Sequence, residues 1–195
     1  MDNLEKARLA NMVLAPYIQK ATALQGKFRY VGGNQFRHAF STLAILMDYH
    51  YFDPVLLKAS VIHDVFEDVQ FVLPNEIIYL DEDGQKVYEL VMEVTRRQIG
   101  NENEPKDVFL KRILTEGSRN AKILKCADRI SNLTDLHSDI FNKSYVRKYI
   151  NESRKWILPM AKEVDQNMLF ELRDIIRRRE ENLKFYTQFW PLRKK

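Results

Sequence analysis

Apolar residues recur at helical spacing along almost the whole chain. In the first segment Leu4, Leu9 and Val13 follow this spacing, and Pro16 interrupts it. No segment shows the strict apolar and polar alternation that marks a half-buried strand. The pattern therefore predicts an all-α fold.

The same periodicity divides the chain into elements. The expected helices cover residues 1–24, 37–51, 54–68, 84–97, 105–116, 118–136, 143–163 and 167–188, with a short helix opening at Pro74. Asp53 and Pro54 fit an N-cap followed by proline at the first helical position. Residues 25–36, which contain Gly32 and Gly33, are expected to form a loop, and the polar segment 98–104 a mobile one. Together these elements predict one domain over residues 1–195, a helical bundle of roughly eight to ten helices.

Composition narrows the class of protein. The chain has 195 residues, 45% of them hydrophobic, which suits one globular domain. No stretch approaches the roughly 20 apolar residues that span a bilayer, and the N-terminus has no secretory signal pattern. Cys126 is the one cysteine, so a disulfide framework and a cysteine zinc cluster are excluded, and we expect it to be a small buried hydrophobe. A cytoplasmic protein with no membrane segment is expected.

Charge is unevenly distributed between the two halves. Residues 1–97 carry a net charge of −3 and residues 98–195 a net charge of +7. A basic half suggests an anionic partner. The run Arg177 to Arg179 is more typical of a solvated helix face than of a nucleic-acid surface, because no recognition motif accompanies it. The oligomeric state, including a homo-oligomer, is left open.

Histidine is scarce, and one of the four histidines lies in an unusual setting. His63 and Asp64 are followed by Glu67 and Asp68 within the apolar helix expected over 54–68. On a helix, residues four apart share a face, so His63 would pair with Glu67 and Asp64 with Asp68. Burying three carboxylates together is costly unless a cation neutralises them, and imidazole with carboxylate suits manganese, iron or zinc.

Two further segments could complete a metal site. His38 opens an otherwise apolar helix. Asp128 lies a few residues after the apolar pair Ile123 and Leu124. With His63 and Asp64 they could supply four ligands. The remaining histidines, His50 and His137, are expected at structural or surface positions, although His137 could border the pocket.

These segments resemble a known family. The pattern of one histidine, a His-Asp pair and a later aspartate is the signature of HD-domain metal-dependent phosphohydrolases. The runs Leu57 to Asp68, Gly84 to Thr95 and Lys125 to Asn132, preceded by Gln25 to Arg29, are similar to the 3′-pyrophosphohydrolase domain of RelA/SpoT-type enzymes and to stand-alone small alarmone hydrolases. The resemblance covers about residues 20–165.

The resemblance implies an activity and a site. The implied reaction is hydrolysis of the 3′-pyrophosphate of guanosine 3′,5′-bis(diphosphate), giving GDP or GTP and pyrophosphate. The implied residues are His38, His63, Asp64 and Asp128 as ligands of a divalent metal, usually manganese; Glu67 and Asp68 as the pair that orients water and moves protons; and Arg29, Lys27, Asn132 and Tyr149 as substrate contacts. No separate synthetase domain is expected.

Four positions depart from the family pattern. Ala39 follows the first histidine where proline is frequent, and Val69 follows Asp68 where threonine is usual. Asp135 replaces a frequent threonine, and Tyr30 replaces a basic residue beside the loop arginine. None of these removes a ligand. An HD phosphohydrolase acting on another nucleotide or phosphorylated small molecule, and a non-catalytic nucleotide- or nucleic-acid-binding module, are the alternatives.

Overall fold

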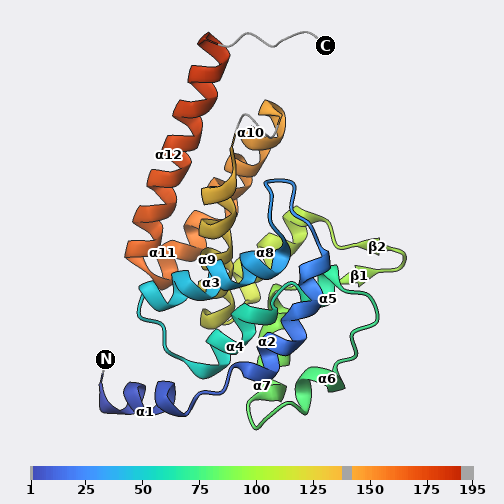
Figure 1. Ribbon diagram of the computed structural model, residues 1–195. Coiled ribbons are helices and arrows are strands. Elements are labelled where there is room, and N and C mark those ends of the chain that lie inside the picture. Colours follow the sequence, from blue (N-terminus) through green and yellow to red (C-terminus); the bar gives the residue numbers. More distant parts are fainter. Residues whose placement is uncertain (1, 138–141, 190–195) are drawn as a thin grey trace.

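Helices account for almost all of the regular structure in the computed structural model, which describes residues 2–137 and 142–189 (Figure 1). The elements in chain order are α1 (Asn3–Asn11), α2 (Ala15–Ala21), a 3₁₀ turn η1 (Thr22–Gly26), α3 (Gln35–Asp48), α4 (Pro54–Ile62), α5 (Val65–Asp68), α6 (Asn75–Ile78), α7 (Gly84–Val94), β1 (Gln98–Ile99), β2 (Glu102–Asn103), α8 (Lys106–Glu116), α9 (Arg119–Asp135), α10 (Lys143–Glu152), a π-helical turn η2 (Ser153–Ile157), α11 (Leu158–Val164) and α12 (Gln166–Phe189). The predicted all-α fold is confirmed, with more and shorter helices than the periodicity indicated.

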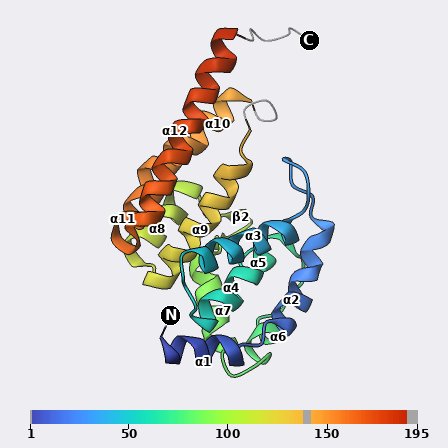
Figure 2. The same ribbon diagram turned by 60° about the vertical axis from the view of Figure 1, so that its left-hand side comes forward.

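The centre of the fold is formed by α3, α4, α7 and α9, which pack against one another. Helix α9 is buried on most of its circumference through residues such as Ile123, Leu124 and Ile130, so any polar group on it is enclosed by neighbours. Figure 2 shows α10, α11 and α12 on one side of α9, and α2, α4 and α7 on the other. Polar residues on α9 therefore lie between these two groups of helices.

Side-chain caps fix where three of the central helices begin. Asn34 accepts a hydrogen bond from the Arg37 amide at the start of α3, and Asp53 accepts one from Leu56 at the start of α4. Ser118 caps α9 in the same way. These residues are the short polar types that satisfy free N–H groups of a first helical turn. Local sequence chemistry thus sets the start of each helix that carries the predicted ligands.

The helix expected over residues 54–68 is interrupted, which corrects the sequence prediction. Helix α4 ends at Ile62, and His63 and Asp64 form a turn before the short α5. In an uninterrupted helix the Ser60 carbonyl would accept the Asp64 N–H, but here it accepts the Nδ1–H of His63 at 2.7 Å. The Asp68 N–H still donates to the Asp64 carbonyl at 2.9 Å, so these two residues share one helical turn, although they line different cavities.

The helix expected over 143–163 is also divided. It contains α10, the turn η2 and α11, with Pro159 in the first turn of α11. Proline has no N–H to donate to the carbonyl four residues earlier, and a π-helical turn accommodates that missing bond. The turn begins at Ser153, one helical turn after Tyr149.

The segment 98–104 forms a hairpin rather than the loop expected. Strands β1 and β2 pair antiparallel around Gly100, whose φ of +64° is the left-handed conformation that glycine adopts easily. The hairpin is held at its base by Glu104, which is 3% exposed and forms an ion pair with Arg112. Among the described residues, no helix is long and apolar enough to cross a membrane.

Candidate active site

The four predicted ligands come from three places in the chain and meet at one point. His38 lies in the first turns of α3, His63 and Asp64 in the turn after α4, and Asp128 in the middle of α9. His38 Nε2 lies 3.0 Å from an Asp128 oxygen and 3.7 Å from an Asp64 oxygen. One potential ligand atom from each of His38, His63 and Asp64 lies within 4.8 Å of the others. We call these four residues the histidine–aspartate cluster.

The His63 ring shows that the cluster has an unsatisfied acceptor. Its Nδ1 faces the Ser60 carbonyl, which can only accept, so Nδ1 carries a hydrogen, and in the neutral ring Nε2 presents a lone pair. This Nε2 is buried and has no hydrogen-bond partner. It lies 3.3 Å from an Asp64 oxygen and 3.9 Å from an Asp128 oxygen, which are also acceptors. Such convergence is unfavourable without a cation, so the residues present fit a divalent metal.

Asp128 is the most strongly constrained member of the cluster. Burial alone would raise its pKa, but the Lys125 ammonium at 2.8 Å and the hydrogen bond with His38 hold the pKa of this carboxyl well below its usual range. Asn132, one turn further along α9, donates to the same carboxylate. Asp128 is therefore ionised and oriented, as a metal ligand must be.

The His38 ring is oriented by a residue that the sequence did not indicate. Its Nδ1 lies 3.0 Å from the Ser131 hydroxyl on α9. The Asp128 carboxylate accepts the hydrogen on Nε2 in this structure, and a metal bound at Nε2 would require Nδ1 to donate to the Ser131 hydroxyl instead. Ser131 and Asp128 are three residues apart on one helix, so both reach the same imidazole.

A cavity of about 250 Å³ opens beside the cluster. Glu67 lies in it, and one of its oxygens accepts the Arg96 backbone N–H at 2.8 Å. The carboxyl stays accessible to solvent through the cavity. Desolvation by the surrounding protein raises the pKa of Glu67, and the nearby Lys125 ammonium and the Arg96 N–H partly oppose this. Glu67 is thus a carboxylate with increased basicity next to the cluster.

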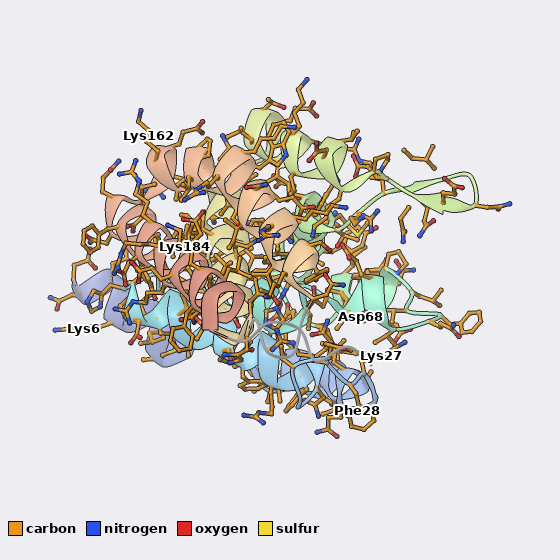
Figure 3. All side chains as sticks on the ribbon, turned by 90° about the horizontal axis from the view of Figure 1, so that it is seen from above. Lys6, Lys27, Phe28, Asp68, Lys162 and Lys184 are labelled. Carbon is orange, nitrogen blue, oxygen red and sulfur yellow. The ribbon has the colours of Figure 1, made fainter. Side chains whose placement is uncertain are left out.

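A second cavity, of about 320 Å³, adjoins the first, and Gln35, Asn132 and Tyr149 line both. Asp68 lies in the second cavity and accepts a hydrogen bond from the Gln35 amide at 2.8 Å. Burial raises the pKa of Asp68, although this hydrogen bond and the charge of Lys27 oppose the rise. Figure 3 shows Asp68 and Lys27 beside each other, with Phe28 at the outer edge.

Arg29 closes one side of the second cavity through contacts to α9. Its guanidinium forms an ion pair with Asp135 and donates to the Asn132 side-chain oxygen at 2.9 Å. The Asn132 amide therefore links Arg29 to Asp128. Asp135, noted above as a departure from the family pattern, is the residue that holds the loop arginine against α9.

Cationic side chains also line the first cavity. Arg96, Lys106, Lys125 and Arg129 line it together with Tyr149. Lys106 Nζ lies 4.7 Å and the Arg129 guanidinium carbon 4.1 Å from the centroid of the Tyr149 ring. Burial lowers the pKa of Lys106. The nearby Arg129 adds to this lowering, and the ion pair of Lys106 with Glu152 opposes it. The cavity is thus lined both by acceptors of the cluster and by cations, of which Lys125 pairs directly with Asp128.

The structure brings all ten predicted site residues to these adjoining cavities and the cluster between them. Sequence reasoning missed Gln35, Ser131, Arg96, Lys106 and the charge of Arg129. Lys125, Arg129 and Ser131 lie within a quoted motif, and Arg96 directly follows another, but Gln35 carried no signal. His50 and His137 are exposed, and Cys126 is buried, which raises the pKa of its thiol.

The comparisons with known proteins establish the fold. No protein-family model matches this sequence, and no curated protein sequence matches it. Among solved structures, the chain is similar to a metazoan ortholog of SpoT, described as hydrolysing ppGpp and acting in starvation responses. The TM-score is 0.72 at 21% identity, over 85% of this chain and 93% of that chain. The resemblance to HD-domain hydrolases of the RelA/SpoT type is therefore confirmed at the level of the fold.

Proposed function

We propose that this chain is a divalent-metal-dependent hydrolase that removes the 3′-pyrophosphate from guanosine 3′,5′-bis(diphosphate), releasing GDP and pyrophosphate. From the pentaphosphate form the nucleotide product would be GTP. The observation that carries the proposal is the buried, unpartnered Nε2 of His63 among Asp64, Asp128 and His38. The fold shared with a ppGpp-hydrolysing protein supports the choice of substrate.

His38, His63, Asp64 and Asp128 would hold the metal, for which manganese is our expectation. When bound, a divalent ion polarises a phosphoryl oxygen and lowers the pKa of bound water. Ser131 and the Ser60 carbonyl keep the two imidazoles in the orientation that presents Nε2. Lys125 neutralises part of the negative charge of Asp128, so the cluster repels an anionic substrate less strongly.

Glu67 would accept the proton of the attacking water. Its raised pKa makes it a better base than an exposed glutamate, and the Arg96 N–H fixes one oxygen while the other stays available. Asp68, held by Gln35 in the adjoining cavity, would relay a proton or orient the water from the nucleotide side.

The second cavity would receive the nucleoside part of the substrate. Arg29 and Asn132 form a fixed edge of this cavity, Lys27 adds a cation at its mouth, and Tyr149 lies where the two cavities meet. A nucleotide bound across both cavities would place its phosphates next to the cluster, where the cationic side chains that line the first cavity could contact them.

One observation favours a second candidate, hydrolysis of a different nucleotide. Phe28, Tyr30 and Tyr145 line the second cavity, so aromatic surface stands beside Arg29. Aromatic rings stack on any base and do not by themselves select guanine.

A substrate panel decides between the candidates. The manganese-loaded protein would be assayed for pyrophosphate release from guanosine tetraphosphate and for phosphate release from mononucleotides. Pyrophosphate release alone supports the first candidate, and phosphate release from mononucleotides supports the second. No release from any substrate, with salt-dependent binding of an oligonucleotide, would favour a non-catalytic module.

A variant pair tests the metal requirement. Asp64→Ala should remove both bound metal and hydrolysis, measured by elemental analysis and by product release. Asp48→Ala is the matched control, because it removes an aspartate from the exposed end of α3. Full hydrolysis by the Asp64→Ala protein without bound metal would contradict the proposal.

A further inference from the structure

Arg129 is a buried cation that no carboxylate neutralises among the described residues. It follows Asp128 on α9 and is 2% exposed. One terminal nitrogen donates to the Ser153 hydroxyl at 3.1 Å, and the guanidinium lies over the Tyr149 ring. Its Nε–H is buried and has no hydrogen-bond partner. A hydroxyl and an aromatic ring offset only part of the cost of burying a full charge.

Another buried arginine has a hydrogen-bond partner at each of its side-chain nitrogens, which shows how unusual the Arg129 arrangement is. Arg112 donates to both oxygens of Glu104, at 3.1 and 2.9 Å, and to the backbone carbonyls of Glu93 and Thr95, each at 3.0 Å. The charge of Arg112 is thus matched by a carboxylate, and its nitrogens by acceptors. Arg129 has no such carboxylate among the described residues, and its Nε–H has no acceptor. Arg129, unlike Arg112, also lines the cavity beside the histidine–aspartate cluster.

The imbalance at Arg129 is the reverse of the imbalance at the cluster. His63 Nε2 is a buried acceptor without a donor, and Arg129 Nε–H is a buried donor without an acceptor. His38, Asp64 and Asp128 of the cluster line the first cavity, and so does Arg129. The Arg129 Nε–H could donate to a ligand that carries negative oxygens at some distance from its reacting phosphorus. The reacting group of the same ligand would lie at the cluster.

We propose that Arg129 is a substrate-binding residue whose Nε–H donates to a non-bridging oxygen of the diphosphate group that is cleaved from the substrate. This rests on the proposed function in taking a diphosphate as the leaving group. Tyr149 and Ser153 act as positioning residues, because they hold the guanidinium in one plane. The π-helical turn that begins at Ser153 places the hydroxyl that Arg129 contacts.

The geometry requires arginine rather than lysine. A guanidinium presents Nε–H and terminal N–H groups in a rigid fork, so it can contact Ser153 at one end and an anion at the other. A lysine ammonium at the same place would keep the charge but lose both the fork and the planar stacking on Tyr149. Arg129→Lys therefore separates charge from geometry.

Direct binding of inorganic pyrophosphate to the manganese-loaded protein tests the proposal without any hydrolysis. By calorimetry, Arg129→Met should weaken pyrophosphate binding by about 10- to 100-fold, the range of a charge-assisted hydrogen bond. Arg129→Lys should fall between wild type and Arg129→Met. Affinity for GDP, which lacks the cleaved diphosphate, should change much less than affinity for pyrophosphate.

Two controls separate binding from structure. Lys155→Met removes a cation from the exposed surface near α10, outside the first cavity, and should leave pyrophosphate affinity within about twofold. In metal-free protein without anion, Arg129→Met should have a melting temperature equal to or above wild type, because an unneutralised buried charge is gone. Unchanged pyrophosphate affinity in Arg129→Met, or equal losses for GDP and pyrophosphate, would overturn the proposal.

The result is independent of the substrate assay. If the protein does not hydrolyse guanosine tetraphosphate but Arg129→Met still selectively loses pyrophosphate, the proposed function fails, and Arg129 is a diphosphate-binding residue but not a contact to a cleaved group. If hydrolysis is found and Arg129→Met binds pyrophosphate like wild type, the inference fails and the function stands.

Discussion

The Arg112–Glu104 ion pair and the histidine–aspartate cluster both bury charged groups between helices, but they balance those charges differently. Around Arg112, each described donor meets an acceptor and the two unit charges cancel. In the cluster, two carboxylates and two imidazoles converge, and His63 Nε2 has no partner. A balanced network stabilises a fold by itself, whereas an unbalanced one has its most favourable state only with a ligand.

The two regions also differ in what surrounds them. Glu104 and Arg112 fasten the β1–β2 hairpin to α7 and α8, and neither residue lines the cavities described above. The cluster is bordered by a cavity that cationic side chains also line. Changes in the first region should therefore act on stability, and changes in the second on metal binding and catalysis.

The largest expected effect comes from breaking the cluster. Asp64→Asn keeps the side-chain shape but removes a charge, and kcat/KM should fall at least about 10³-fold, because several kcal/mol of transition-state stabilisation are lost. Metal-free Asp64→Asn should melt no lower than metal-free wild type, since repulsion within the cluster is relieved. Kinetics with manganese and thermal unfolding in chelator measure the two effects. A large stability loss would mean that the cluster is structural.

Breaking the balanced pair should give the opposite result. Arg112→Met leaves Glu104 buried without a counter-charge and should lower the free energy of unfolding by about 3–5 kcal/mol. Hydrolysis per folded molecule should be unchanged. Urea unfolding and active-site-normalised kinetics test this. A loss below about 1 kcal/mol would show that the pair is not a stabilising unit.

A smaller effect should follow from a residue that only orients a ligand. Ser131→Ala removes the partner of His38 Nδ1 and should weaken metal affinity by about 10- to 100-fold. Thr134→Ala is the control, because it removes a hydroxyl from the same helix that contacts only the Ile130 carbonyl. Competition with a chromogenic chelator measures both. Equal affinities in the two variants would rule out the orienting role of Ser131.

The smallest expected effect is on the pH dependence of stability, to which the carboxyls of Glu104 and Asp68 should contribute with opposite signs. The hydrogen bond with Arg112 lowers the pKa of Glu104, so Glu104 contributes stability above its usual value near 4.5, and this is lost as pH falls through the lower folded pKa. Burial raises the pKa of Asp68, so the folded state binds its proton more tightly than the unfolded state. Asp68 therefore lowers stability as pH rises from its usual value near 3.8 through the folded pKa.

Urea unfolding of metal-free protein across about pH 2–7, a range that extends below the usual pKa of both groups, separates the two carboxyls. Glu104→Gln should reduce the loss of stability at low pH relative to its own value at neutral pH. Asp68→Asn should reduce the loss that accompanies rising pH. Slopes that change in the same direction would show that the two carboxyls do not differ as described.

Much of the fold could be predicted from local sequence. Asp53 was predicted as an N-cap, and α4 begins directly after it. Ser118 caps α9 at the expected start of that helix, whereas α3, capped by Asn34, begins at Gln35 and not at the expected residue 37. The break after Ile62 could not be predicted, because it depends on the His63 ring competing for the Ser60 carbonyl. Burial of Glu104 could not be predicted either, since its partner, Arg112, lies on the next helix.

Prediction of the site was strong where a motif exists and weak elsewhere. The ten predicted residues meet around the cluster and its two cavities, although their roles stay predictions. Gln35 and Ser131 were missed, because each acts through one hydrogen bond to a residue far away in sequence: Asp68 for Gln35 and His38 for Ser131. A single sequence does not record such pairs.

The sequence by itself determined the helical character of the chain, its division into capped segments and the residue types available as ligands, since these depend on periodicity and on chemistry within one or two turns. Only the tertiary structure decided that, within the part of the chain that the structure describes, His63 Nε2 and Arg129 Nε are buried without a hydrogen-bond partner. The physical reason is that a buried group's free energy depends on every neighbour that replaces water, and those neighbours come from helices far apart in the chain.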